Sequence, residues 1–275
     1  MLVSIITVTY NAQALLRPTI ESVLAQTYPR IEYIVVDGGS TDGTLDIIRA
    51  YEGRLAKVVS EPDRGIYDAM NKGIRMASGS LIGMINASDL YEPDAVERMV
   101  QACRSHPDAG ILHGDIKMYN SDGSFFKRKK PQIDPEQLKR GMVVYHPTCF
   151  VTAETYKACG LYDPDFKIAG DYEFMLRCLR MGVRFHYVDA VISHFRKGGL
   201  SDVAQDNTQR ESCEALHRNG YPDAYVQAIM KSWQHQAAVD RRNQHVYDWM
   251  RRLLPAPLMD WLAARISQRK GERGG

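Results

Sequence analysis

The chain has 275 residues, of which 44% are hydrophobic and 25% charged, and its net charge is only +2. This composition is typical of a soluble globular protein. So small a net charge gives no general electrostatic reason to expect a nucleic acid or a membrane as partner. The five cysteines are scattered without a C-x-x-C pair, which argues for a reducing compartment and against a structural zinc site. Because the amino terminus also lacks the basic region of a signal peptide, we expect a cytoplasmic protein.

The first half of the chain alternates strands and helices. Apolar runs rich in β-branched residues predict strands at 2–9, 31–36, 57–60 and 81–86. Apolar residues at helical spacing predict helices near 18–24 and at 44–51 and 66–77. This alternation predicts an α/β fold with a parallel sheet, right-handed crossovers and helices on both faces.

The second half is less regular. We expect a helix at 93–105, a hairpin of strands 111–119 and 124–127, a short helix from Asp134, a strand at 147–152, a helix from Gly170 and a strand at 184–188. A glycine-containing loop follows at 194–201, and the chain from 202 onward is expected to be helical, with breaks near 220–222 and 255–257. The basic run 127–130 is typical of a solvated face.

Three acidic residues, Asp37, Asp63 and Asp89, follow three successive predicted strands. Ligands of open α/β sheets bind at the carboxyl ends of the strands, so these side chains are expected to lie along one edge. Asp89 either holds a divalent cation against a phosphate or starts the turn before the next helix. The glycines after Asp37 do not form the G-x-G-x-x-G pattern and follow the second strand, which makes an NAD-binding enzyme a poor fit.

Five segments together resemble the family 2 glycosyltransferases, which have the GT-A fold. They are 3–11 (VSIITVTYN), 37–44 (DGGSTDGT), 63–73 (DRGIYDAMNKG), 86–89 (NASD) and 170–173 (GDYE). The third segment is similar to the form found in O-antigen and exopolysaccharide glycosyltransferases. The resemblance covers about residues 1–200, and it implies a catalytic domain 1–200, with a nucleotide-sugar half at 1–105 and an acceptor half at 106–200. Residues 201–275 would then form a helical extension.

On the donor side, the resemblance implies that a UDP-linked sugar binds near Thr7, Thr9, Tyr10, Asp37 and Asp63. Ser88 and Asp89 take the place of the D-x-D element, so Asp89 would hold Mg²⁺ or Mn²⁺ as its only carboxylate ligand. Many relatives carry an arginine where this chain has Met70. The charge of the diphosphate would then be balanced by Arg64 or Lys72, although either could equally be a surface cation.

The resemblance also assigns the acceptor side. Asp171 takes the place of the catalytic base of an inverting reaction, with the cap of a helix as the alternative. His194 occupies the region where some relatives add a ligand to the metal or diphosphate, with loop structure as the alternative. His146 and Tyr172 are candidates for acceptor contacts, and a structural role is the alternative for His146.

The function implied is transfer of a sugar from a nucleotide-diphospho-sugar to a saccharide or lipid-linked saccharide, in the synthesis of surface polysaccharide. A sugar nucleotidyltransferase is one alternative, but it needs a glycine-rich basic loop after the first strand, and residues 10–13 provide none. The other alternative is a sensor that binds nucleotide sugars without catalysis.

The carboxyl-terminal segment has apolar residues at helical spacing: Val226, Ile229, Met230, Trp233, Val246, Trp249, Met250, Leu253, Leu258, Trp261, Leu262 and Ile266. Between Arg241 and Arg273 there are eight basic residues and three acidic ones. Basic amphipathic helices of this kind bind anionic membrane surfaces, which would place the protein on the inner face of the membrane. The apolar faces could equally pack on the catalytic domain or form a homodimer.

Overall fold

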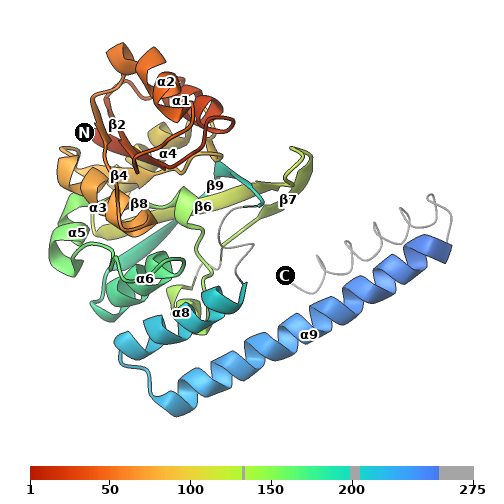
Figure 1. The fold of residues 1–275 in the computed structure, drawn as a ribbon. Helices are drawn as coiled ribbons and strands as arrows, with labels where there is room; N and C mark the ends of the chain where they lie inside the picture. Colours follow the sequence, from red (N-terminus) through yellow and green to blue (C-terminus); the bar gives the residue numbers. More distant parts are fainter. Residues whose placement is uncertain (132–133, 199–204, 254–275) are drawn as a thin grey trace. The chain divides into compact units, whose positions relative to one another are not determined.

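The computed structural model describes residues 1–131, 134–198 and 205–253 (Figure 1). The chain forms two compact units, residues 1–221 and 222–275. Within the described residues, the first unit contains a nine-stranded sheet of order β3-β2-β1-β4-β8-β6-β9-β5, with β7 paired to β6 beside this path. None of the helices in these ranges has the length and apolar character needed to cross a membrane.

The first four strands form the parallel half of the sheet. They are β1 (Val3–Thr9), β2 (Ile31–Asp37), β3 (Lys57–Ser60) and β4 (Leu81–Met84). Helices α1 (Leu16–Leu24), α2 (Thr44–Ala50) and α3 (Ile66–Met76) and the 3₁₀ turn η1 (Glu52–Arg54) lie between them. The register sets Thr9 beside Asp37. The predicted alternation is confirmed, and it brings the ends of β1, β2 and β4 to one edge of the sheet.

The second half makes the sheet mixed. It contains β5 (Leu90–Tyr91), α4 (Ala95–Ser105), β6 (Ala109–Tyr119), β7 (Phe125–Lys129), η2 (Pro135–Arg140), η3 (His146–Thr148), β8 (Phe150–Thr152), α5 (Ala153–Cys159), α6 (Gly170–Arg180) and β9 (Arg184–Arg196). Strand β8 joins the two halves, because it runs antiparallel to both β4 and β6. Strand β9 is parallel to β6 and antiparallel to β5. We did not predict β5 or α5.

The strand predicted at 184–188 is longer than expected, and this changes the status of His194. Strand β9 continues to Arg196, so His194 lies in a strand and not in the predicted loop. The cause is pairing on both sides, since His194 lies opposite Leu90 of β5 and Lys117 of β6. These are long-range backbone bonds, which the composition of residues 194–201 does not reveal.

Helices cover both faces of the sheet. Apolar residues of α1, α2 and α4 form one continuous buried cluster with Ile5 and other residues of the strands. Helix α3 packs against β1 and β2. There Gly73 allows close approach, since a Cβ at this position would lie 2.4 Å from Ile6 Cγ2. The alternation of Ile5 and Ile6 between the two faces therefore anchors β1 at the centre of the fold.

Two helices follow β9. Helix α8 (Gln205–Arg218) packs on α6 and belongs to the first unit, which continues to Tyr221, whereas we placed the domain boundary at residue 200. Helix α9 (Asp223–Leu253) belongs to the second unit and begins after the expected break near 220–222. The break expected at 255–257 and the apolar positions 258–266 lie outside the described residues.

Candidate active site

A pocket of about 770 Å³ lies at the carboxyl edge of the sheet. The β1–α1 loop, the β4–β5 loop, the start of α3, the loop before α6 and the end of β9 all contribute to its lining. Seven of the predicted site residues line it: Thr9, Tyr10, Asp63, Ser88, Asp89, His146 and Asp171. Thr7, Asp37, Arg64, Lys72, Tyr172 and His194 do not.

Asp37 organises the loop that follows β2. Its carboxylate is fully buried and accepts hydrogen bonds from the N–H groups of Gly39 (3.1 Å) and Ser40 (3.0 Å) and from the hydroxyl groups of Ser40 and Ser60. A Cβ at Gly38 would lie 2.5 Å from the carboxylate of Asp63, so the two acidic loops are in close contact. Asp37 therefore shapes the rim of the pocket through the backbone of its own loop.

The end of strand β1 contributes a buried hydroxyl group, and the residue that follows it contributes an exposed ring. Tyr10 is 62% exposed, whereas the Thr9 hydroxyl is buried and has no hydrogen-bond partner within the described residues. Thr7 lies deeper, where its hydroxyl bonds that of Tyr33 at 3.0 Å. Thr9 and Tyr10 are thus available to a ligand in the pocket, and Thr7 supports the strand beneath them.

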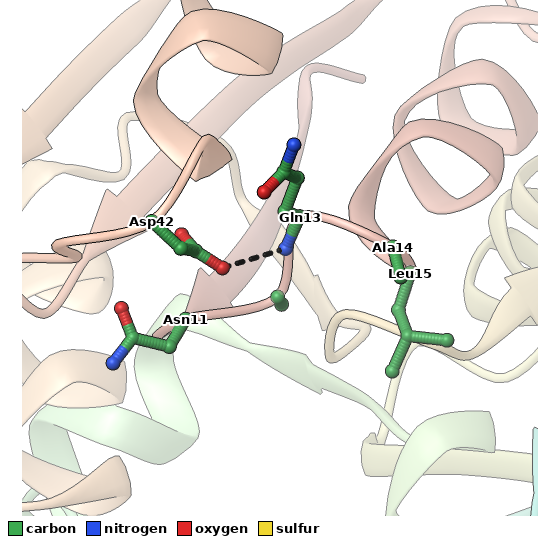
Figure 2. Close-up of a pocket in the computed structure, with 6 residues that line it drawn as sticks. Asn11, Gln13, Ala14, Leu15 and Asp42 are labelled. Carbon is green, nitrogen blue, oxygen red and sulfur yellow. Dashed lines mark hydrogen bonds between the residues drawn. The ribbon is translucent and has the colours of Figure 1, made fainter.

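The β1–α1 loop is braced against the loop after β2. A hollow of about 490 Å³ lies here, and its lining includes Asn11, Gln13 and Asp42, whose side chains are labelled in Figure 2. Here the Gln13 N–H donates to the Asp42 carboxylate at 3.1 Å, and the Asn11 side chain accepts from the Thr41 N–H at 2.9 Å. The bonds fix one wall of the larger pocket, because Asn11 lines both hollows.

Asp89 differs from Asp37 in its partners. It is only 2% exposed, and within the described residues its carboxylate accepts a hydrogen bond from the Arg196 N–H at 3.3 Å. Burial raises the pKa of Asp89 to about 8, and the bond from Arg196 opposes this shift only in part. The side-chain oxygen of Asn86, in the same loop, is also buried without a partner in the part of the chain described.

These oxygen atoms fit a divalent cation. A buried carboxylate needs a compensating positive charge, and Mg²⁺ and Mn²⁺ accept carboxylate, phosphate and water oxygens. The described residues contain no cluster of three or more His, Cys, Asp and Glu side chains that could hold a metal. A cation beside Asp89 would therefore take ligands from outside these side chains, such as oxygen atoms of a donor phosphate and of water.

Asp171 lies in the first turn of α6. Its Oδ1 accepts from the Tyr172 N–H at 2.8 Å and from the Tyr67 hydroxyl at 3.2 Å. The Tyr67 hydroxyl also lies 2.6 Å from the Ile168 carbonyl oxygen, and burial together with the Asp171 charge raises the pKa of Tyr67. The N-cap position is Ala169, so Asp171 is not the helix cap that we considered as an alternative.

The cations at the pocket differ from those predicted. The Lys72 ammonium bonds the Pro62 carbonyl oxygen (2.9 Å) and the Glu61 carboxylate (3.0 Å), and the Arg64 side chain is 73% exposed. Three cations that we did not predict line the pocket instead: Lys167, Arg196 and Lys197. The sequence feature that could have indicated Arg196 and Lys197 is a pair of basic residues directly before two glycines.

The three remaining candidates are held by protein groups. His194 Nε2 lies 2.7 Å from the Glu92 carboxylate, which also accepts from Lys117 at 2.6 Å. His146 lines the pocket, but its Nε2 bonds the Tyr162 hydroxyl at 3.0 Å, and burial lowers its pKa. Tyr172 is buried and donates to the Leu138 carbonyl oxygen at 2.6 Å.

The sequence matches the profile of Glycosyl transferase family 2 over residues 4–157. The chain is 30% identical over 213 residues to a PGL/p-HBAD biosynthesis glycosyltransferase of Mycobacterium bovis (strain BCG / Pasteur 1173P2), a match that covers 74% of this chain and 80% of the relative.

Solved structures support the same fold. Staphylococcus aureus TarS 1–349 in complex with UDP-GlcNAc has a TM-score of 0.63 at 19% identity and covers 84% of this chain and 70% of its own. The mannosyltransferase PcManGT of Pyrobaculum calidifontis, in complex with GDP-Man and Mn²⁺, has a TM-score of 0.64 at 19% identity and covers 97% and 79%. The fold is therefore of the GT-A type, and the chain is a glycosyltransferase that belongs to family 2.

Proposed function

We propose that this enzyme transfers a sugar from a UDP-linked donor to a hydroxyl group of a saccharide or lipid-linked saccharide, with inversion at the anomeric carbon. The observation that carries the proposal is the pocket itself. Two carboxylates line it together. Asp89, in the first half of the fold, is buried and has, among the described residues, a single weak hydrogen bond to offset its burial, and Asp171, in the second half, accepts a hydrogen bond from Tyr67.

Departure of the nucleoside diphosphate requires positive charge at its phosphates. Lys167, Arg196 and Lys197 line the pocket and would bind the diphosphate, while Thr9, Tyr10 and the loops of Asp37 and Asp63 would hold the nucleoside. A divalent cation, held by Asp89 and the donor phosphates, would supply further neutralisation of the leaving group. The Mn²⁺ and GDP-Man of PcManGT and the UDP-GlcNAc of TarS support this use of the fold.

The acceptor hydroxyl must lose its proton on the face of the sugar opposite the leaving group. Asp171 is the proposed base. Its Oδ1 is engaged by Tyr67 and by the Tyr172 N–H, which leaves Oδ2 for the acceptor. A single displacement of this kind inverts the configuration at the anomeric carbon.

The proposed acceptor is a saccharide or lipid-linked saccharide of surface polysaccharide synthesis. The mycobacterial relative, named for PGL/p-HBAD biosynthesis, supports a biosynthetic role of this kind. Such acceptors are carried by membranes, so we propose a peripheral site on the inner face of the membrane. If the segment after about residue 240 is the anchor, its removal should abolish binding to anionic liposomes and spare donor hydrolysis. If that segment forms a homodimer, the truncated chain should instead sediment as a monomer.

Two alternatives have their own tests. A sugar nucleotidyltransferase would release pyrophosphate from UTP and a sugar phosphate. A sensor that binds nucleotide sugars would need no base, so Asp171→Asn would leave its behaviour unchanged.

The decisive experiment screens the purified protein against a panel of nucleotide sugars, with and without MnCl₂, for release of the nucleoside diphosphate. We expect release from a UDP-sugar, loss of transfer in Asp171→Asn with UDP binding retained, and a product of inverted configuration by NMR. A retained configuration would overturn the mechanism, and failure of every donor would overturn the function.

A further inference from the structure

The loop that leads into α6 is fastened by a residue more than 40 positions away. Glu211 of α8 accepts hydrogen bonds from three consecutive N–H groups, those of Lys167 (3.0 Å), Ile168 (2.8 Å) and Ala169 (3.0 Å). All three bonds reach the same carboxylate oxygen, Oε2. Asp171 follows two residues after Ala169, so the bonded backbone leads directly to the proposed base.

The fastened loop is also part of the pocket. Lys167 and Ile168 line it, and the Ile168 carbonyl oxygen accepts from Tyr67, which in turn bonds Asp171. The Lys167 ammonium donates to the Arg64 carbonyl oxygen at 2.9 Å, which ties the loop to the start of α3. Helix α8 itself is anchored, because Ala215 and Leu216 are fully buried and Arg218 pairs with Asp163 in the same loop.

From this arrangement we infer that Glu211 is a positioning residue for Asp171. Helix α8 would then support the active site through the hydrogen bonds of Glu211. The inference rests on the proposed role of Asp171 as base. A carboxylate suits this position, because charge strengthens the hydrogen bonds from three converging N–H groups. Without it, the loop and the first turn of α6 would gain freedom, and a displacement of about 1 Å at a reacting group can cost roughly a hundredfold in rate.

The test compares Glu211→Ala, Glu211→Gln and Glu214→Ala in the full chain. Glu214 is a matched control on the same helix, since its carboxylate pairs with Arg218 of that helix. We expect Glu211→Ala to lower kcat roughly ten- to a hundredfold, with donor KM and UDP affinity nearly unchanged. In Glu211→Gln the amide oxygen can replace Oε2 as acceptor, so kcat should recover to within about threefold of wild type.

Hydrogen exchange provides a readout that does not depend on activity. The amide protons of residues 167–169 should exchange faster in Glu211→Ala than in wild type or in Glu214→Ala. Faster exchange with unchanged kcat would overturn the positioning role. A wild-type protein that exchanges as expected but transfers no sugar would overturn the proposed function and leave the fastening of the loop intact.

A second observation concerns the β6–β7 hairpin, residues 119–130, which projects from the sheet in Figure 1. Phe125 is 59% exposed and Phe126 is 43% exposed. They precede the basic run 127–130. The Lys197 ammonium lies 3.3 Å from the centre of the Phe126 ring, and both Lys197 and Ser121 line the pocket.

This surface contains more basic than acidic residues. Residues 119–130 and 196–197 carry six cations and one carboxylate, that of Asp122. Two carboxylates from outside these ranges pair with it, the buried Asp115 with Arg128 and Asp189 with Lys130. Exposed aromatic rings beside long basic side chains suit the interface of an anionic bilayer, where rings enter the headgroup region and ammonium groups meet phosphates.

We propose that this hairpin docks the enzyme on an anionic lipid surface, with the mouth of the pocket beside the bilayer. Sedimentation with vesicles of phosphatidylcholine and phosphatidylglycerol, at 30 mol% of the latter and low salt, tests it with the full chain. We expect binding to these vesicles and little to phosphatidylcholine alone. Lys127→Glu/Lys129→Glu and Phe125→Ser/Phe126→Ser should each weaken binding by about tenfold.

The matched control is Lys157→Glu/Arg180→Glu, which makes the same charge change at exposed positions of α5 and α6 and should leave binding near wild type. If the control loses vesicle binding to the same extent, the loss is due to the change in net charge, and the assignment of binding to the hairpin is overturned. Binding to soluble polygalacturonate without binding to the vesicles would make the hairpin a site for acidic glycans and would also overturn it.

Discussion

Asp37 and Asp89 are two buried carboxylates in the parallel half of the sheet, one at the end of β2 and the other after β4, yet they differ in the hydrogen bonds that they accept. Asp37 accepts hydrogen bonds from two backbone N–H groups and two serine hydroxyl groups. Asp89 accepts one, at 3.3 Å, and lines the pocket. Burial without compensation is costly in the free protein, so it indicates a group that is completed by a ligand. Asp37 stabilises the fold of its own loop, whereas Asp89 is the carboxylate that we propose for the reaction.

The largest effect should come from Asp89. Replacement by Ala is expected to lower transfer by about 10³-fold, since it removes the carboxylate proposed to hold the cation that would neutralise the leaving diphosphate. Stability should be unchanged or higher, because an underpaired buried carboxyl group is lost. EDTA should have a similar effect on the wild type. Steady-state rates and thermal melts measure both, and full transfer by the EDTA-treated enzyme would refute the role of the metal.

Asp37→Asn should show the opposite pattern, with a large loss of stability and a smaller loss of activity. The amide oxygen can take the place of Oδ2, but the NH₂ group then replaces Oδ1 and cannot accept from the Ser40 hydroxyl. The bonds that remain also lose the strength that the charge of the carboxylate gives them, so the free energy of unfolding should fall by about 3 kcal/mol. Activity measured well below the melting temperature should fall less than in Asp89→Ala. Denaturant titration supplies the stability, and Asp42→Asn, in the same loop but on the surface, is the control. A stable but inactive Asp37→Asn would show that Asp37 acts on the donor directly.

His113 tests whether an unsatisfied buried group must belong to a site. Its Nδ1 is buried without a partner in the described chain, and it does not line the pocket. Burial lowers its pKa to about 4, so the unfolded state takes up the proton first as the pH falls below 6.5. The contribution of His113 to stability should therefore be constant above pH 6.5 and decline by about 3 kcal/mol between pH 6.5 and 4. His113→Leu should remove this decline without affecting the rate at pH 7.5, and denaturant melts against pH measure it.

These contrasts also explain what the sequence could predict. The parallel half follows from local patterns, and the elements predicted there are observed with small changes at their ends. Asp89 and Asp171 were found because each stands in a short motif with a chemical reason for its residue type. Arg196 and Glu211 were missed for different reasons. Arg196 reaches the pocket because long-range pairing extends β9. Glu211 bonds backbone N–H groups, and the sequence of residues 167–169 does not indicate which side chain accepts from them.

The smallest effect should come from Lys72, which we first considered as a cation for the diphosphate. Its ammonium is bonded to the Pro62 carbonyl oxygen and to Glu61, and it does not line the pocket, whereas Lys197 does. Lys72→Ala breaks a partly exposed ion pair, which contributes only about 0.2–1 kcal/mol to stability, and donor KM should stay within about twofold of wild type. Lys197→Ala should raise donor KM about tenfold, since charged hydrogen bonds contribute roughly 1.5–3 kcal/mol. Donor titrations of the two variants at fixed acceptor decide the matter. If Lys72→Ala has the larger effect on KM, the loop before α3 moves onto the donor when it binds, and the contrast between a cation in the lining of the pocket and one outside it fails.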